Sequence, residues 1–184
     1  MRMSKDGFTA ADVVNGYSEA DLTHILKKYG EEKFSRIIAR NIVKRREQKP
    51  IERTSELAEI IKSSIPARAR RDKNPCKRSF QAIRIVVNGE LDSLEKGLES
   101  AFDMLKAGGR LVIITFHSLE DRIVKHKYIE WSKGCICPPK SPICVCGNLP
   151  KAKIINKKAI EPSEKEKENN LRSRSAKLRI LEKL

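Results

Sequence analysis

The feature that most constrains this chain is residues 108–122, GGRLVIITFHSLEDR, where a glycine pair leads into an apolar run that ends at polar residues. Leu111 to Ile114 are consecutive, apolar and rich in β-branched side chains, so they predict a strand buried on both faces within a parallel sheet. Ser118 and Asp121 then predict the start of a helix, because serine caps orphan amides and an acid stabilises the first turn. We therefore expect an α/β fold.

The residues that follow this strand are the first candidates for a functional site. In open α/β sheets, ligands bind outside the carboxyl ends of the strands. Residues 115–118, TFHS, occupy that end of the predicted strand. We therefore expect substrate contact or chemistry at this point of the chain.

The charge of the chain favours a polyanionic partner. The 184 residues include 39 Lys and Arg against 24 Asp and Glu, a formal net charge of +15. Nucleic acid is the leading candidate, and the alternative is a basic, solvated surface, because charge alone identifies no site. No segment approaches the roughly 18 apolar residues of a membrane span, and no signal-peptide core follows the first residues. We expect a cytoplasmic protein with no membrane partner.

Residues 9–63 predict a succession of short helices. Thr9 with Asp12, and Ser18 with Asp21, each fit an N-terminal box in which a capping hydroxyl precedes an acid by three. The helix predicted from Phe34 carries a basic outer face that either lies on a phosphate backbone or is solvated. That face consists of Lys33, Arg36, Arg40, Lys44, Arg45 and Arg46.

Residues 64–78 predict a linker or exposed loop, because they hold six basic residues, one acid and two prolines. Each of these cations can neutralise a phosphate, which positions RNA without specifying its sequence. The candidate RNA contacts in this linker are Arg68, Arg70, Arg71 and Lys73, with Lys77 and Arg78 beyond them.

Later elements follow the same periodic signals. A helical pattern runs from Ser79 to Lys106, and Gly89 predicts a kink or break within it. Residues 153–156 predict a short strand, and Ser163 predicts the cap of a charged helix. Alternating apolar residues at 176, 178 and 180 predict a final half-buried strand.

Four of the five cysteines form two C-x-C pairs separated by six residues: Cys135, Cys137, Cys144 and Cys146. Four thiolates this close can make a tetrahedral zinc site. The usual zinc ribbon has two residues between its cysteines, so paired C-x-C is less diagnostic. We expect reduced thiols in a proline-rich loop and no metal, with zinc as the alternative.

Several stretches together resemble one protein family. They are residues 9–15, 29–34, 40–43, 56–61, 79–91, 108–125 and 172–179, among which FHSLEDRIVK at 116–125 is a specific signature. The family is that of the bacterial methyltransferases that modify the exocyclic amine of a cytosine in small-subunit ribosomal RNA, the MraW or RsmH family. The resemblance covers nearly the whole chain.

The resemblance implies a class I, Rossmann-like methyltransferase fold that binds S-adenosylmethionine in a mostly parallel sheet and carries a helical insertion that helps to hold RNA. On this reading, residues 1–78 are the helical insertion and residues 79–184 are the carboxyl-terminal half of the methyltransferase domain. No glycine-rich cofactor loop occurs in the sequence, because the pair Gly108 and Gly109 precedes a strand. We therefore expect a partial fold without cofactor-binding residues, inactive alone, with one edge and one apolar face of the sheet exposed.

On the methyltransferase hypothesis, the candidate catalytic residues follow the strand predicted at residues 111–114 and face the active-site edge of the sheet. They are His117, Ser118 and Asp121, while Arg122 is a candidate contact to an RNA phosphate. The alternative is structural, with Ser118 and Asp121 as caps and His117 as a satisfied polar residue at a strand end. Asn88 and Glu90 are weaker candidates, for which a packing role in the helix is favoured.

Two functions from different classes remain open. The first is part of a ribosomal RNA methyltransferase whose partner is ribosomal RNA or the small ribosomal subunit. The second is a stand-alone basic RNA-binding module without catalysis, stabilised by zinc if the cysteines bind it.

Overall fold

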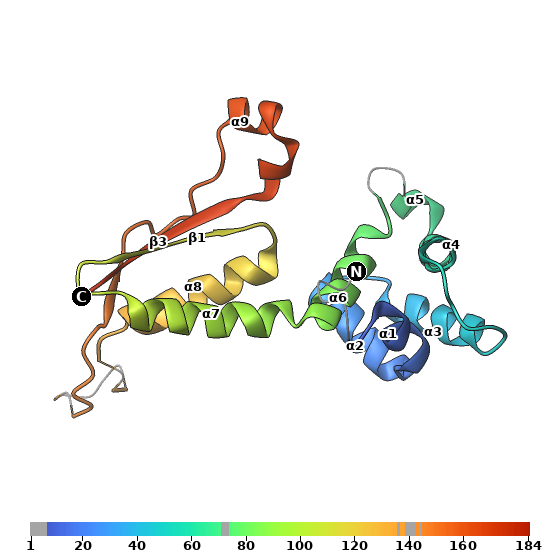
Figure 1. The fold of residues 1–184 in the computed structure, drawn as a ribbon, viewed down its shortest axis with the longest axis horizontal. Coiled ribbons are helices and arrows are strands. Elements are labelled where there is room, and N and C mark those ends of the chain that lie inside the picture. The colour runs from blue at the N-terminus through green and yellow to red at the C-terminus, as the bar shows by residue number, and fades with distance from the viewer. Residues whose placement is uncertain (1–6, 71–73, 136, 139–142, 144) are drawn as a thin grey trace. The chain divides into compact units, whose positions relative to one another are not determined.

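The computed structural model describes residues 7–70, 74–135, 137, 138, 143 and 145–184 (Figure 1). The chain divides into two compact units, of which the first reaches to Glu90 and the second runs from Leu91 to Leu184. Within the described residues, no helix is both long and apolar enough to cross a membrane.

The first unit is helical. Its elements are α1 (Ala10–Gly16), α2 (Glu19–Gly30), α3 (Ser35–Arg46), α4 (Thr54–Ser64), α5 (Ala67–Arg70) and α6 (Lys77–Asn88). Both predicted N-terminal caps are confirmed, because the side chains of Thr9 and Ser18 accept hydrogen bonds from the amides of Asp12 and Asp21. The inward faces of the helices form one apolar core, in which Leu22, Ile38, Ile42, Ile61 and Ile83 are fully buried.

Helices α2 and α6 approach each other closely at Gly30. A Cβ atom placed on this glycine would lie 2.7 Å from the carbonyl oxygen of Arg78, a distance that real Cβ contacts essentially never show. The glycine at the end of α2 is therefore required by packing, since only its missing side chain lets the two backbones meet.

The long helical pattern after Ser79 is interrupted where the sequence predicted. Helix α6 ends at Asn88, α7 (Glu90–Met104) begins two residues later, and Gly89 between them has a left-handed φ of 57°. Contacts divide the units after Glu90, so α6 packs with the helical unit. The assignment of functional roles to residues 1–78 and 79–184 stays a prediction.

The second unit is an α/β layer. Its elements after α7 are β1 (Arg110–Thr115), α8 (Ser118–Ser132), β2 (Ala152–Ile154), α9 (Glu164–Asn169), a short 3₁₀ helix (Leu171–Ser175) and β3 (Lys177–Lys183). Helices α7 and α8 lie along one side of the strands (Figure 1). They bury a core in which the rings of Phe102 and Trp131 stack, with centroids 4.1 Å apart, next to Leu98, Val124 and Leu181.

The pairing of the strands corrects the expectation of a parallel sheet. The strand order is β1-β3-β2, and β3 is antiparallel to both neighbours, so Leu111 pairs with Leu181 and Ala152 pairs with Lys183. Strands β1 and β2 consequently point the same way, with the reversed β3 between them. The sequence of residues 111–114 does not predict whether the neighbouring strand is parallel or antiparallel, because an apolar run indicates only that the strand is buried.

The apolar run predicted that strand β1 is buried on both faces, and this prediction is wrong. Leu111 and Thr115 are buried against the helices, whereas Val112 and Ile114 on the opposite face are 50% and 54% exposed. Within the described residues, β1 is an edge strand with a single neighbour. The expectation of one exposed edge and one exposed apolar face of the sheet is therefore confirmed for the described residues.

Candidate functional site

The turn after β1 is held by a reciprocal capping box. The side chain of His117 accepts the amide of Glu120 through Nδ1 (3.4 Å), and the Glu120 carboxylate accepts the amides of Phe116 (2.8 Å) and His117 (3.2 Å). The N-cap of α8 is thus His117 and not Ser118, which is a correction of the sequence expectation. His117 is the N-cap because Glu120, three residues later, completes the reciprocal capping box with it.

A further contact joins the side chains of His117 and Glu120 directly. Nε2 of His117 lies 3.1 Å from Oε1 of Glu120, which is an ion-pair distance, although the direction at this buried nitrogen is not that of a hydrogen bond. Burial raises the pKa of Glu120, but the His117 side chain and the backbone amides outweigh burial and hold that pKa below its ordinary 4.5. Glu120 is therefore a fixed anion that positions the imidazole.

Asp121 is held by the last strand. Arg179 of β3 donates to both carboxylate oxygens of Asp121, and the ammonium group of Lys177 lies 3.8 Å from Oδ2. The hydrogen bonds from Arg179 lower the pKa of Asp121 below its ordinary 3.8, against the opposing effect of burial. A carboxylate kept ionised in this way acts as a fixed negative charge and not as a proton donor near neutral pH.

The structure places the other candidates of this turn at the surface. Ser118 and Arg122 are exposed, His117 is half-buried, and each of the three has interactions within the protein. His117 and Ser118 follow β1 directly at the start of α8, and Arg122 lies four residues further along that helix. The catalytic roles of His117, Ser118 and Asp121 remain a prediction.

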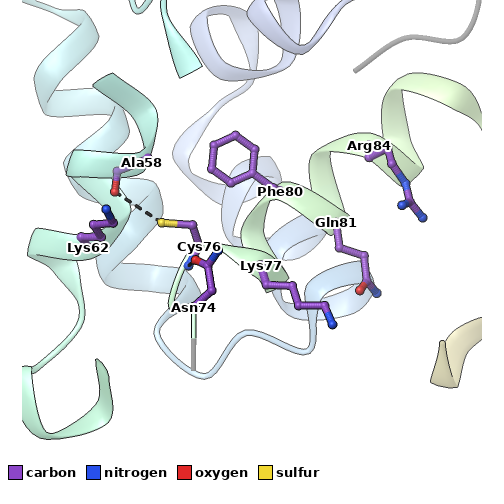
Figure 2. Close-up of a pocket in the computed structure, with 8 residues that line it drawn as sticks. All are labelled: Ala58, Lys62, Asn74, Cys76, Lys77, Phe80, Gln81 and Arg84. Carbon is purple, nitrogen blue, oxygen red and sulfur yellow. Dashed lines mark hydrogen bonds between the residues drawn. The ribbon is translucent and has the colours of Figure 1, made fainter. Parts of the chain in front are cut away.

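A basic groove of about 450 Å³ lies in the helical unit between α4 and α6 (Figure 2). It is lined by Ala58, Lys62, Asn74, Cys76, Lys77, Phe80, Gln81 and Arg84. The lining combines three cations with two amides and one aromatic ring, which are the groups that bind phosphates, base edges and base faces. In Figure 2 the side chains of Lys77, Gln81 and Arg84 project from one side of α6.

Two groups that line the groove contribute little positive charge: the Cys76 thiol and the Arg84 guanidinium. Cys76 is buried and its thiol donates to the carbonyl of Ala58 at 3.5 Å, while burial raises the pKa of this thiol. Arg84 makes a bidentate ion pair with Glu90 at 2.8 and 2.9 Å. Most of the attraction for an anion therefore comes from Lys62 and Lys77.

The groove residues Lys62, Phe80, Gln81 and Arg84 were missed by the sequence analysis. A signal existed, because Lys77, Gln81 and Arg84 follow at i, i+4 and i+7 and so share one helix face. That stripe shows which residues of α6 are polar together, but the opposing α4 becomes visible only in the folded unit.

The linker is placed only in part, whereas the whole basic face of α3 lies within the described residues. Arg68 and Arg70 are exposed on α5, whereas Arg71 and Lys73 lie outside the described residues. Arg46 does not belong to a phosphate-binding face, since its guanidinium donates to the carbonyls of Val14 (2.7 Å) and Tyr17 (2.6 Å). It closes the end of α1, where carbonyls lack helical partners.

Asn88 and Glu90 lie at the ends of two helices and not in a helix interior, which corrects the packing role that the sequence favoured. The Asn88 amide donates to the carbonyl of Arg84 (3.0 Å) and to Glu90 (3.1 Å), and Glu90 binds Arg84. Together they close the carboxyl end of α6 next to the left-handed Gly89.

Three thiols meet in the loop after α8. The sulfur atoms of Cys135, Cys137 and Cys146 all lie within 4.8 Å of one another. Cys144, the fourth cysteine of the predicted alternative zinc site, lies outside the described residues.

The chain belongs to the MraW methylase family, whose sequence model matches residues 1–184. Within this family it is similar to proteins named ribosomal RNA small subunit methyltransferase H. It is 59% identical over 185 residues to the one from Clostridium botulinum strain Loch Maree, covering 100% of this chain and 60% of that protein. For the Carboxydothermus hydrogenoformans protein the identity is 58% over 176 residues, covering 96% and 57%. The resemblance found in the sequence is thus confirmed, and the chain spans about 60% of the length of these curated relatives.

S-adenosylmethionine, which the family implies, does not fit the strand-to-helix turn that follows β1. An adenosine- or phosphate-binding turn needs glycines for close backbone approach and amides that point at the ligand. Phe116 and His117 supply no glycine, and their amides already donate to Glu120. This turn therefore provides no cofactor cradle.

Proposed function

We propose that this chain is part of a methyltransferase that modifies the exocyclic amine of a cytosine in small-subunit ribosomal RNA, and that its helical unit holds the RNA. The observation that carries the RNA role is the groove between α4 and α6, whose lining includes Lys62, Lys77 and the aromatic ring of Phe80. A ribosomal RNA substrate supports a cytoplasmic location as part of this proposal.

The sheet supports a partial class I fold. Strands β1 and β2 run in the same direction, and one reversed strand lies between them, a pattern compatible with a mostly parallel sheet that carries an antiparallel strand. Within the described residues, β1 has an unpaired edge on which a further strand of a methyltransferase sheet pairs. Val112 and Ile114, exposed on the open face, are then covered by further elements of the same domain.

In this proposal the turn after β1 faces the target nucleotide. Methyl transfer depends on holding donor and acceptor in line, so most of the contribution of these residues is positioning. Arg122 contacts an RNA phosphate, and His117 or Ser118 lies near the base, while Glu120 and Asp121 keep the turn in place. The 184 residues are inactive alone, because they supply no glycine-rich cofactor turn.

The RNA role is tested by the salt dependence of binding. Fluorescence anisotropy with a single-stranded RNA from the small subunit should give a log affinity that falls linearly with log salt, by about 0.7 per neutralised phosphate. Replacing Lys62 and Lys77 together by Ala should flatten that slope by about 1.4. The matched control replaces Lys27 and Lys28, two exposed lysines of α2, and should leave the slope unchanged.

An equal effect of both double replacements would show that the groove has no special part in RNA binding. The catalytic part of the proposal is tested separately by calorimetric titration of the chain with S-adenosylmethionine. We expect negligible heat, and a one-site micromolar dissociation constant would contradict the absence of a cofactor cradle.

The second candidate function is a stand-alone RNA-binding module without catalysis. The cluster of three thiols favours this function, because a metal bound by them would stabilise a small binding domain. The two functions are distinguished by a methyl-transfer assay in which this chain is mixed with the remaining parts of a methyltransferase. Incorporation of a labelled methyl group into small-subunit RNA is expected if the chain is part of an enzyme. No incorporation is expected if it is a stand-alone binding module.

A further inference from the structure

The loop of residues 133–151 connects α8 to β2 and is long for a compact domain. Connections above about 15 residues without secondary structure usually have a function or an additional constraint. Within its described residues the loop has no helix or strand. Its apolar side chains do not form a core of their own, since Ile143, Val145 and Leu149 are 74%, 87% and 77% exposed.

The ends of this loop are fixed. The Asn148 side chain donates to the carbonyls of Lys133 (3.1 Å) and Gly134 (2.6 Å), and the amide of Lys151 donates to the carbonyl of Trp131 (2.8 Å). These bonds bring the segment after α8 beside the segment before β2. Cys135 and Cys137 lie on the first segment and Cys146 on the second.

The thiols that meet there have the spacing of metal ligands. The sulfur of Cys146 lies 3.7 Å from that of Cys135, and the amide of Cys137 donates to the sulfur of Cys135 at 3.4 Å. With Zn–S bonds of about 2.3 Å, two corners of a zinc tetrahedron are about 3.8 Å apart. All three sulfurs lie within 4.8 Å of one another, so a small inward movement brings them to that spacing.

We propose that Cys135, Cys137 and Cys146 bind a zinc ion, which takes the place of an apolar core in fixing the loop between α8 and β2. The sequence favoured reduced thiols without metal, because C-x-C pairs are not the usual zinc knuckle. The structure changes that preference, since ligand spacing is set by where the two segments meet and not by the number of residues within each pair. No ligand role is assigned to Cys144. The proposal does not depend on the RNA function.

Zinc binding also explains how this loop keeps one conformation although its apolar residues are exposed. A metal that bridges two segments contributes its binding free energy to folding, because the unfolded chain has no preformed site. Three thiolates at one point would otherwise be open to oxidation, since exposed thiolates are the reactive form of cysteine.

The test begins with the unmodified chain, purified under reducing conditions without chelator and analysed for metal by mass spectrometry. We expect close to stoichiometric zinc, its loss on treatment with a chelator, and its return on titration with Zn²⁺. Co²⁺ in place of zinc should give thiolate-to-metal charge-transfer absorption and the strong visible bands of a tetrahedral site.

Single replacements Cys137→Ser and Cys146→Ser should abolish stoichiometric zinc. The matched control is Cys76→Ser, which changes a buried cysteine that lies in the groove of the helical unit and should keep full zinc. Absence of zinc from the purified chain together with no uptake on titration would overturn the proposal. Retention of zinc by both loop variants would overturn it as well, as would a disulfide between Cys135 and Cys146 in the reduced preparation. The cobalt spectrum of the unmodified chain decides the matter even if a variant does not fold.

Discussion

Arg179 of β3 donates two parallel hydrogen bonds to Asp121 of α8, from Nε to Oδ1 at 2.7 Å and from a terminal nitrogen to Oδ2 at 3.0 Å. Their side chains are only 11% and 12% exposed. The pair joins two of the stretches that resemble the MraW family, residues 108–125 and 172–179. At these two positions the resemblance therefore coincides with a structural contact between the helix after β1 and the last strand.

Replacing Asp121 by Asn should destabilise the second unit by about 3 kcal/mol, because it leaves the guanidinium of Arg179 nearly buried without its counter-charge. Urea unfolding followed by the fluorescence of Trp131, the one tryptophan of the sequence, measures this loss. The control is Glu130→Gln, which removes an exposed partner of Lys127 and should cost less than about 1 kcal/mol. Equal losses for the two variants would mean that the Asp121 pair is no stronger than a surface ion pair.

The contribution of this pair should depend on pH in a defined direction. Arg179 lowers the folded-state pKa of Asp121 below the ordinary value of 3.8. The stabilisation is therefore fully present above about pH 4 and is lost as the pH falls through the folded-state value. The difference in unfolding free energy between the unmodified chain and Asp121→Asn should be constant from neutral pH to about pH 5 and shrink below about pH 4. A difference that grows on acidification would contradict this assignment.

Replacing Gly30 by Ala should destabilise the helical unit by about 1–3 kcal/mol, because the new Cβ meets a backbone carbonyl that cannot move aside alone. The contact is the carbonyl of Arg78, 2.7 Å from the Cβ position. Gly16→Ala is the matched control, since it also lies at a helix end but has nothing within 4 Å of its Cβ position. Thermal unfolding followed by circular dichroism at the helix band compares the two, and a Gly30→Ala melting curve like that of the control would show that α2 and α6 can separate without cost.

Replacing Arg68, Arg70 and Arg71 together by Ala should flatten the salt dependence of RNA binding by about 2, at about 0.7 per phosphate on single strands. The variant should weaken binding to the small-subunit RNA and to a scrambled RNA alike, because phosphate contacts carry no sequence information. The comparison protein carries Ala at Lys153, Lys158 and Lys165, three exposed lysines of the second unit. An unchanged slope for the arginine variant would mean that the linker is a solvated connection, and the groove between α4 and α6 would remain the proposed RNA surface.

The sequence by itself determined the features that depend on neighbours in the chain. The caps at Thr9, Ser18 and Ser163, and the break at Gly89, all occur where they were predicted. Each depends on contacts within four residues or on the φ angle of one glycine, so the local sequence holds the whole cause. The family was also determined by sequence, because the specific FHSLEDRIVK stretch is a pattern of residues and needs no coordinates.

Only the tertiary structure decided the features that join distant segments. The antiparallel pairing of β1 with β3 and the ion pair of Asp121 with Arg179 connect residues about 60 positions apart, and no local pattern encodes which partner is met or in which direction. The groove beside Phe80 and the meeting of Cys135 with Cys146 likewise arise where separate segments pack. The physical reason is that burial, charge and ligand spacing at these places are properties of two segments together, which are set when the cores of the two units close.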